Sequence, residues 1–215
     1  MKVPQLTFYF DFISPYAYLA FERLPLVLQG VSHAVRYQPV LFGSLLQHHG
    51  TIGPAELAAK REWTYRHVLW LAQHQGTPMR MPASHPFNPL GLLRLALACG
   101  GDRLPNRWHC ERIFRHVWAE GGDPLEADRL AHLTQELKPP ADPASDEVKL
   151  RLRTGTQAAL DAGVFGVPTV AVGGKLFWGL DALPMLRDHL DGGAWFAGSA
   201  WDDAAQVPVG IVRKR

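Results

Sequence analysis

The stretch from Leu6 to Leu19, LTFYFDFISPYAYL, decides the fold of this chain. Its first seven residues are aromatic or apolar at most positions, a pattern typical of a buried central strand. Ser14 and Pro15 come next, and a serine followed by a proline favours the start of a helix with the serine as its N-cap. Apolar residues then recur at helical spacing, and Gly30 ends the predicted helix.

Two further regions carry strand signals. Residues 34–40 follow the first helix, so that strand, helix and strand form a βαβ unit with parallel strands. Residues 169–172 and 175–178 are joined by Gly173 and Gly174, a two-residue turn that predicts a β-hairpin. A last helix is predicted over residues 181–190.

The interval between these regions is predicted to be almost entirely helical. The predicted helices cover residues 54–76, 89–98, 105–120, 125–137 and 146–162, and one face of the third carries Trp108, Ile113, Phe114, Val117 and Trp118. This order indicates an α/β, thioredoxin-like fold (βαβ…ββα) with a large helical insertion.

We therefore predict a thioredoxin-like domain from residues 1–45 and 164–215, and an inserted helical domain from residues 46–163. The segment after Gly192, including Arg213-Lys214-Arg215, is weakly patterned. We expect this segment to pack loosely or to contact another subunit.

Composition excludes several classes of protein. The formal charge of +2 offers no basic field for nucleic acid or an anionic membrane. No stretch reaches the roughly 18 apolar residues of a membrane helix, and the segment from Met1 to Leu6 lacks the pattern of a signal peptide. We therefore expect a soluble cytoplasmic protein. The histidines lack ligand spacing with acidic partners, so we expect no metal.

The cysteines give no sign of redox chemistry. Cys99 and Cys110 lie on separate predicted helices and form no CxxC motif. The segment from Phe10 to Leu19 nevertheless resembles the N-terminal signature of the DsbA-like superfamily, in which a CPxC element caps the first helix. Ser14 stands at the first cysteine position of that element and Ala17 at the second. Because thiol–disulfide exchange needs a nucleophilic thiol, that activity is excluded here.

With serine at this position, the sequence resembles the 2-hydroxychromene-2-carboxylate isomerases and the kappa-class glutathione transferases. The resemblance implies that glutathione is the cofactor and that Ser14, the catalytic residue, donates a hydrogen bond to its thiolate. Lowering the thiol pKa by about two units requires roughly 2.7 kcal/mol. One hydrogen bond to a charged group, at about 1.5–3 kcal/mol, and the helix dipole can supply it. The alternative is that Ser14 is only an N-cap.

Further glutathione contacts are implied by the same resemblance. Val167 and Pro168 precede a strand and resemble a cis-proline loop, whose outward backbone would pair with glutathione; an ordinary strand-starting proline is the alternative. Leu180 and Asp181 resemble a motif whose amides hold the γ-glutamyl carboxylate and whose aspartate pairs with the amine.

The segment from Gly50 to Lys60 also resembles a family segment. Lys60 would pair with the glycyl carboxylate, although a solvated lysine is the alternative, and Thr51 stands where the family has asparagine. The predicted wall for a small, flat aromatic substrate consists of Tyr16, Trp63, Phe87 and Asn88. For each of the three aromatic residues, the alternative is a place in the core, and Asn88 resembles a family position that faces the ring.

The resemblance therefore implies a glutathione-dependent cis-trans isomerase that interconverts a 2-hydroxychromene-2-carboxylate and a 2-hydroxybenzalpyruvate-type intermediate. Relatives are commonly dimers, so we expect a homodimer. One alternative is a kappa-class glutathione transferase that conjugates electrophiles. The other is a non-catalytic thioredoxin-like binding protein in which Ser14 is a remnant.

Overall fold

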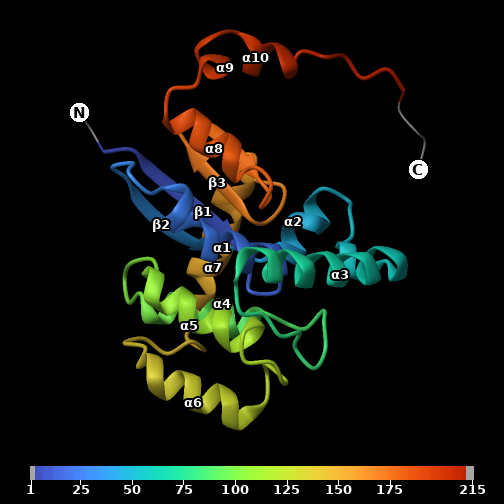
Figure 1. The fold of residues 1–215 in the computed structure, drawn as a ribbon. Coiled ribbons are helices and arrows are strands. Elements are labelled where there is room, and N and C mark those ends of the chain that lie inside the picture. The colour runs from blue at the N-terminus through green and yellow to red at the C-terminus, as the bar shows by residue number, and fades with distance from the viewer. Residues whose placement is uncertain (1–2, 212–215) are drawn as a thin grey trace.

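The strands form one mixed sheet at the centre of the molecule. A computed structural model of the chain describes residues 3–211, and Figure 1 shows its fold. The strands in this part of the chain lie in the order β2–β1–β3–β4, where β1 is Gln5–Phe10, β2 is Ala34–Pro39, β3 is Thr169–Val172 and β4 is Lys175–Trp178. β1 pairs parallel with β2 and antiparallel with β3, and β3 and β4 form the predicted antiparallel hairpin. The first strand is therefore central, as predicted.

Helices surround this sheet, and most of them come from the interval between β2 and β3 (Figure 1). They are α1 (Pro15–Val27), α2 (Phe42–His48), α3 (Ala58–Gln75), α4 (Leu90–Cys99), α5 (Arg107–Trp118), α6 (Ala127–Leu137), α7 (Asp146–Asp161), α8 (Leu183–Leu190), α9 (Ala194–Ala197) and α10 (Ala200–Ala204), with a short 3-10 turn, η1, at Pro54–Glu56. None of the helices described between residues 3 and 211 is long and apolar enough to cross a membrane.

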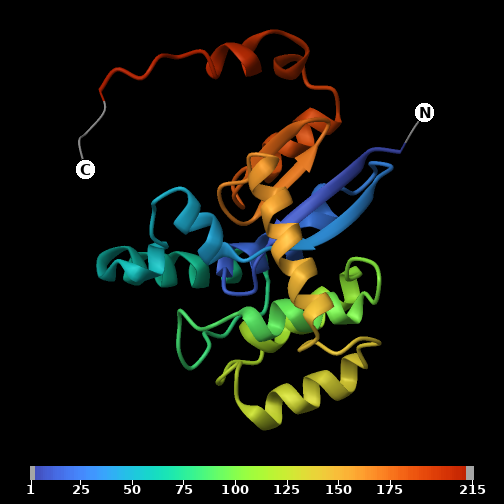
Figure 2. The ribbon, with the colours of Figure 1, turned by 180° about the vertical axis from the view of Figure 1, so that it is seen from behind.

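β1 faces two cores because its side chains alternate across the sheet. Phe8 and Phe10 are fully buried. The Phe8 ring lies 6.2 Å from that of Phe21 in α1, and the Phe10 ring lies 5.3 Å from that of Phe114 in α5. Tyr9 faces the other way and packs against a smaller buried cluster that includes Ala159 of α7. Seen from behind, α7 crosses the sheet on this second face (Figure 2).

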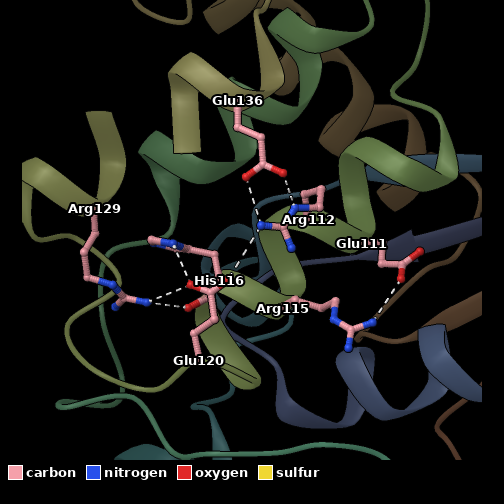
Figure 3. Close-up of polar contacts among 7 residues, drawn as sticks. All are labelled: Glu111, Arg112, Arg115, His116, Glu120, Arg129 and Glu136. Atoms are coloured by element: carbon pink, nitrogen blue, oxygen red, sulfur yellow. Dashed lines mark hydrogen bonds and ion pairs between the residues drawn. The ribbon is translucent and has the colours of Figure 1, made fainter. Parts of the chain in front are cut away.

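The helices α5 and α6 are joined by charged side chains. Arg112 donates to both carboxylate oxygens of Glu136 at 2.6 and 2.9 Å, and Arg129 donates to Glu120 at 3.3 Å (Figure 3). The buried His116 imidazole lies 3.7 Å from Glu120, and its Nε2 is 3.0 Å from the Pro124 carbonyl. Burial lowers the pKa of His116, so the imidazole beside Glu120 is neutral.

Several predicted boundaries were wrong for local reasons. The helix predicted over residues 54–76 is divided at Leu57, which takes an extended conformation between η1 and α3. The last helix begins at Leu183 rather than Asp181, because Pro184 suits the first turn of a helix and Gly179 has a φ of +103°. The prediction missed α2, which is only seven residues long. The Trp108 side chain is 47% exposed and does not share the buried face of α5.

The division into a thioredoxin-like domain and an inserted domain at residues 46–163 stays a prediction. The helix α2 runs across the first boundary of the predicted insertion. Part of the segment after Gly192 is packed, since the rings of Phe196 and Trp201 lie 6.0 and 5.7 Å from that of Phe177. Met1, Lys2 and Arg213-Lys214-Arg215, which entered the sequence predictions, lie outside the described residues.

Candidate active site

A cavity of about 1390 Å³ opens beside the N-terminus of α1. The start of α1, the segment from Leu41 to Glu56, the inner face of α3, the loop before β3 and the loop before α8 all line it. Four segments that are distant in sequence from the start of α1 thus share this cavity with Ser14. The cavity is large enough to hold a tripeptide and a small aromatic molecule together.

Ser14 occupies the N-cap of α1, as predicted. Its Oγ accepts a hydrogen bond from the Ala17 amide at 3.2 Å, and its side chain is nearly buried but lines the cavity. Because Oγ is the acceptor in this bond, the hydroxyl hydrogen is free to donate to a group in the cavity. Pro15 has no amide hydrogen, so the Tyr16 amide is the first donor of the helix that a ligand can use.

The loop that carries Ser14 is held by two side chains from the helical block. The Trp118 indole donates to the Phe12 carbonyl at 2.8 Å, and Nε2 of His85 lies 2.8 Å from the Ile13 carbonyl. Because a carbonyl only accepts, Nε2 of His85 carries the hydrogen. Nδ1 lies 2.8 Å from the Tyr65 hydroxyl, which donates to the His85 carbonyl at 2.8 Å. Burial lowers the pKa of His85, which keeps the imidazole in this neutral form.

Asp11 ties the same loop to α2. Its Oδ1 accepts from the Ile13 amide at 3.1 Å and its Oδ2 from the Phe42 amide at 2.9 Å, while its own carbonyl accepts from the Ser14 amide at 3.1 Å. The carboxyl group is fully buried, and burial raises its pKa to about 7 against the pull of these amides. Asp11 therefore changes charge near neutral pH directly beside the Ser14 loop.

The opposite wall is the loop before β3. The Val167–Pro168 peptide is cis, as the predicted cis-proline loop requires, and the Pro168 carbonyl accepts from the Gly179 amide at 2.9 Å. Neither backbone group of Val167 has a partner among the described residues. Phe165 and Trp178, whose rings are 4.9 Å apart, are both about half exposed at the rim of the cavity.

A third wall comes from α3. The Tyr16 hydroxyl lies 2.9 Å from Nδ1 of His67, and both side chains line the cavity. The His67 ring is stacked between the rings of Trp63 and Trp70, with interplanar angles of 13° and 11°. This stack fixes the orientation of the imidazole toward Tyr16.

The cavity brings together seven of the eleven residues predicted for the site. These are Ser14, Tyr16, Thr51, Val167, Pro168, Leu180 and Asp181. Lys60 is exposed on α3 and is not among the lining residues. Trp63 is 65% exposed and reaches the cavity only through the ring it stacks against His67.

Phe87 and Asn88 also lie outside the lining. Phe87 packs on the main core, and its ring is 6.1 Å from that of His85. The Asn88 side chain is exposed and accepts from the Leu90 amide at 3.1 Å, just before α4. Of the two residues, Phe87 therefore packs against the lining residue His85.

Sequence reasoning missed several lining residues with chemical potential. They are Asp11, Arg23, His67, His85, Phe165, Trp178 and Arg187. A lone carboxylate inside an aromatic strand was a readable signal for Asp11. Arg23 lies on α1 about 13 Å along the helix axis from Ser14, and its guanidinium has no partner among the described residues. Within residues 3–211, no three His, Cys, Asp or Glu side chains gather as a metal site would require.

The fold and the cavity define a thioredoxin-like protein whose helix-capping position carries a hydroxyl instead of a thiol. Both cysteines are buried and free, in α4 and α5, and neither lines the cavity. Burial raises the pKa of Cys99 to about 11 and raises that of Cys110 well above the usual thiol range, so neither is a ready nucleophile.

Comparisons with known proteins agree with this class. Residues 5–191 match the family model of the DSBA-like thioredoxin domain. A 2-hydroxychromene-2-carboxylate isomerase from Pseudomonas putida is 31% identical over 191 residues, which cover 85% of this chain and 92% of that protein. Glutathione S-transferase kappa 2 from Caenorhabditis elegans is 28% identical and is covered over 90% of its length.

The solved structure of a 2-hydroxychromene-2-carboxylate isomerase superposes with a TM-score of 0.76 at 26% identity, covering 95% of this chain and all of that one. The chain therefore belongs to the DsbA-like thioredoxin-domain family and, within it, to the 2-hydroxychromene-2-carboxylate isomerase family.

Proposed function

We propose that this protein is a glutathione-dependent cis-trans isomerase that interconverts a 2-hydroxychromene-2-carboxylate and a 2-hydroxybenzalpyruvate-type product. The observation that carries the proposal is the Ser14 hydroxyl, which caps α1, faces the cavity and has its hydrogen available. The isomerases and kappa-class transferases among the relatives support the same chemistry.

Glutathione binds along the loop before β3 in this proposal. The free amide and carbonyl of Val167, beside the cis Pro168, pair with the cysteinyl backbone and direct its thiol to Ser14. Asp181 pairs with the γ-glutamyl amine, next to the amide of Leu180. Thr51 lines the opposite wall. Arg23, which has no partner among the described residues, is a better placed cation for a carboxylate than Lys60.

The reaction then needs no net oxidation or reduction. The hemiketal ring of the chromene opens first, with its hydroxyl hydrogen passing to the phenol oxygen, and this gives a conjugated carbonyl. The thiolate adds to the conjugated system, which converts a double bond into a single bond, and elimination after rotation returns glutathione unchanged. Covalent assistance of this kind divides one high barrier into two lower ones. The aromatic rim formed by Phe165 and Trp178, together with Tyr16, gives a flat substrate apolar faces to rest on.

The test is the ultraviolet-monitored interconversion of 2-hydroxychromene-2-carboxylate, with and without glutathione. Acceleration that requires glutathione, with no loss of glutathione over many turnovers, supports the isomerase. Consumption of glutathione with an electrophile and no isomerisation supports a kappa-class transferase instead.

Ser14→Ala tests the residue. We expect it to slow turnover by roughly one to two orders of magnitude, the value of one hydrogen bond to a charged group, and to weaken the thiolate absorbance of bound glutathione. Ser145→Ala is the matched control, because Ser145 caps α7 in the same way, accepting from Val148 at 3.3 Å, and lies outside the cavity. Wild-type turnover in both variants would leave Ser14 as a cap and remove the proposed mechanism. The homodimer stays a prediction that light scattering can check.

A further inference from the structure

The side chains of Tyr16 and His67 meet in a hydrogen bond, and a tyrosine that only packs against a substrate does not need such a partner. The two residues are 51 positions apart, yet the Tyr16 hydroxyl meets Nδ1 of His67 at 2.9 Å. Tyr16 is the second residue of α1, so it stands one turn or less from Ser14 on the same cavity wall. A hydroxyl with a partner on α3 therefore lines the same cavity as Ser14, where the thiol is expected.

The surroundings of His67 restrict what this imidazole can do. Trp63 and Trp70 lie nearly parallel to its ring on either side, which leaves only the ring edge for polar contacts. Its Nδ1 meets Tyr16, and its Nε2 has no partner among the described residues. With a hydrogen on Nδ1, His67 donates to the Tyr16 oxygen, and the hydroxyl hydrogen of Tyr16 is then turned toward the cavity.

The isomerisation needs a second hydrogen-bond donor in the cavity, besides Ser14. In the chromene, the ring C2–O bond first breaks and the hemiketal hydrogen passes to the phenol oxygen, which leaves a carbonyl conjugated with the C=C bond. When the sulfur lone pair then forms the S–C bond, the electron pair of the C=C bond moves to the carbonyl, whose oxygen becomes an enolate oxygen. The negative charge has then passed from sulfur, beside Ser14, to this oxygen. After rotation about the new single bond, the enolate electrons return, the S–C bond breaks and the thiolate is restored. No proton is consumed in this sequence.

We propose that Tyr16 is the hydrogen-bond donor to the enolate oxygen and that His67 is the positioning residue that turns its hydroxyl toward the substrate. The inference rests on the proposed isomerase function and assigns a separate oxyanion site within the same cavity. Thr64, buried on α3 one turn before His67, also lines this part of the cavity. Burial raises the pKa of Tyr16, so the phenol keeps its hydrogen and remains a donor.

The first experiment compares Tyr16→Phe with Tyr9→Phe. We expect Tyr16→Phe to lower kcat for isomerisation by about 100-fold, the usual loss when one oxyanion donor is removed, with a small change in KM. The thiolate absorbance of bound glutathione should stay at the wild-type level, because Ser14 is intact. Tyr9→Phe removes a hydroxyl from β1 outside the cavity and should retain wild-type turnover.

The second experiment tests whether His67 acts through Tyr16. His67→Ala should lower kcat by about tenfold, and His67→Asn, whose amide can donate from nearly the same place as Nδ1, should recover most of that loss. The double variant with Tyr16→Phe and His67→Ala should be no slower than Tyr16→Phe alone, because the two residues form one unit. A merely structural effect of His67 would add to that of Tyr16.

The outcomes separate the two claims. A wild-type protein that fails to isomerise the substrate overturns the proposed function, whatever Tyr16 does. An active wild type with a Tyr16→Phe variant within twofold of it overturns the enolate donor. Loss of the thiolate absorbance in Tyr16→Phe also overturns it, since Tyr16 would then serve the thiol and not the substrate.

Discussion

Asparagine in place of Asp11 is expected to remove a specific pH dependence of stability. The Asp11 carboxyl has no exposed surface and accepts hydrogen bonds from the Ile13 and Phe42 amides, and burial raises its pKa from the ordinary aspartate range to about 7. A carboxyl group whose pKa is higher in the folded protein binds its proton more tightly there than in the unfolded chain. Its contribution to stability is therefore full below the unfolded pKa and is lost as the pH rises through about 7.

The size follows from linkage between the two pKa values. Between pH 5 and pH 8 the contribution of Asp11 to the free energy of unfolding falls by roughly 3 kcal/mol. The buried histidines act in the opposite direction, because lowered pKa values, such as those of His85 and His116, weaken the fold as the pH falls. The pH profile of the wild type alone is thus a sum, and only its difference from the Asp11→Asn profile isolates the carboxyl.

Urea unfolding at several pH values between 5 and 8 measures this difference. Asp11→Asn should be the less stable protein at pH 5, because its amide NH₂ faces a backbone N–H and one hydrogen bond is lost, at about 1–3 kcal/mol. The gap should narrow or reverse by pH 8. The control is Asp191→Asn, because Asp191 is an exposed carboxylate paired with Arg187. Its difference in stability from the wild type should show no comparable change with pH. Parallel profiles for wild type and Asp11→Asn would refute the reasoning.

Two smaller predictions follow from the same contacts. Gly166→Ala would place its Cβ 2.6 Å from Nε1 of Trp178, so the half-exposed indole must move. We expect calorimetry to show weaker glutathione binding, with a stability loss of about 1 kcal/mol or less. Unchanged affinity for glutathione would contradict a role of Trp178 at the rim of the cavity. A double-mutant cycle with Arg112→Gln and Glu136→Gln should give a coupling of about 0.5–1 kcal/mol that falls with added salt, whereas a coupling insensitive to salt would argue against a partly solvated pair.

Much of the architecture is local information, and the sequence contains it. The aromatic run before Ser14, the Ser-Pro start of α1 and the Gly173-Gly174 turn each depend on neighbours within a few residues, and all three are confirmed. The substitution of serine at the helix-capping position is equally local. These features were sufficient to predict the thioredoxin-like fold and the loss of redox chemistry, because periodicity and turn chemistry act over one or two turns of chain.

The tertiary structure alone decided which side chains meet at Ser14. Trp118 holds the Phe12 carbonyl from 106 residues away, His85 holds Ile13 from 72 residues away, and His67 reaches Tyr16 across 51. Such pairs leave no periodic trace, because they depend on how helices pack and not on the spacing within one. The raised pKa of Asp11 has the same origin, since desolvation by the surrounding elements exists only once the core has closed around its carboxyl group.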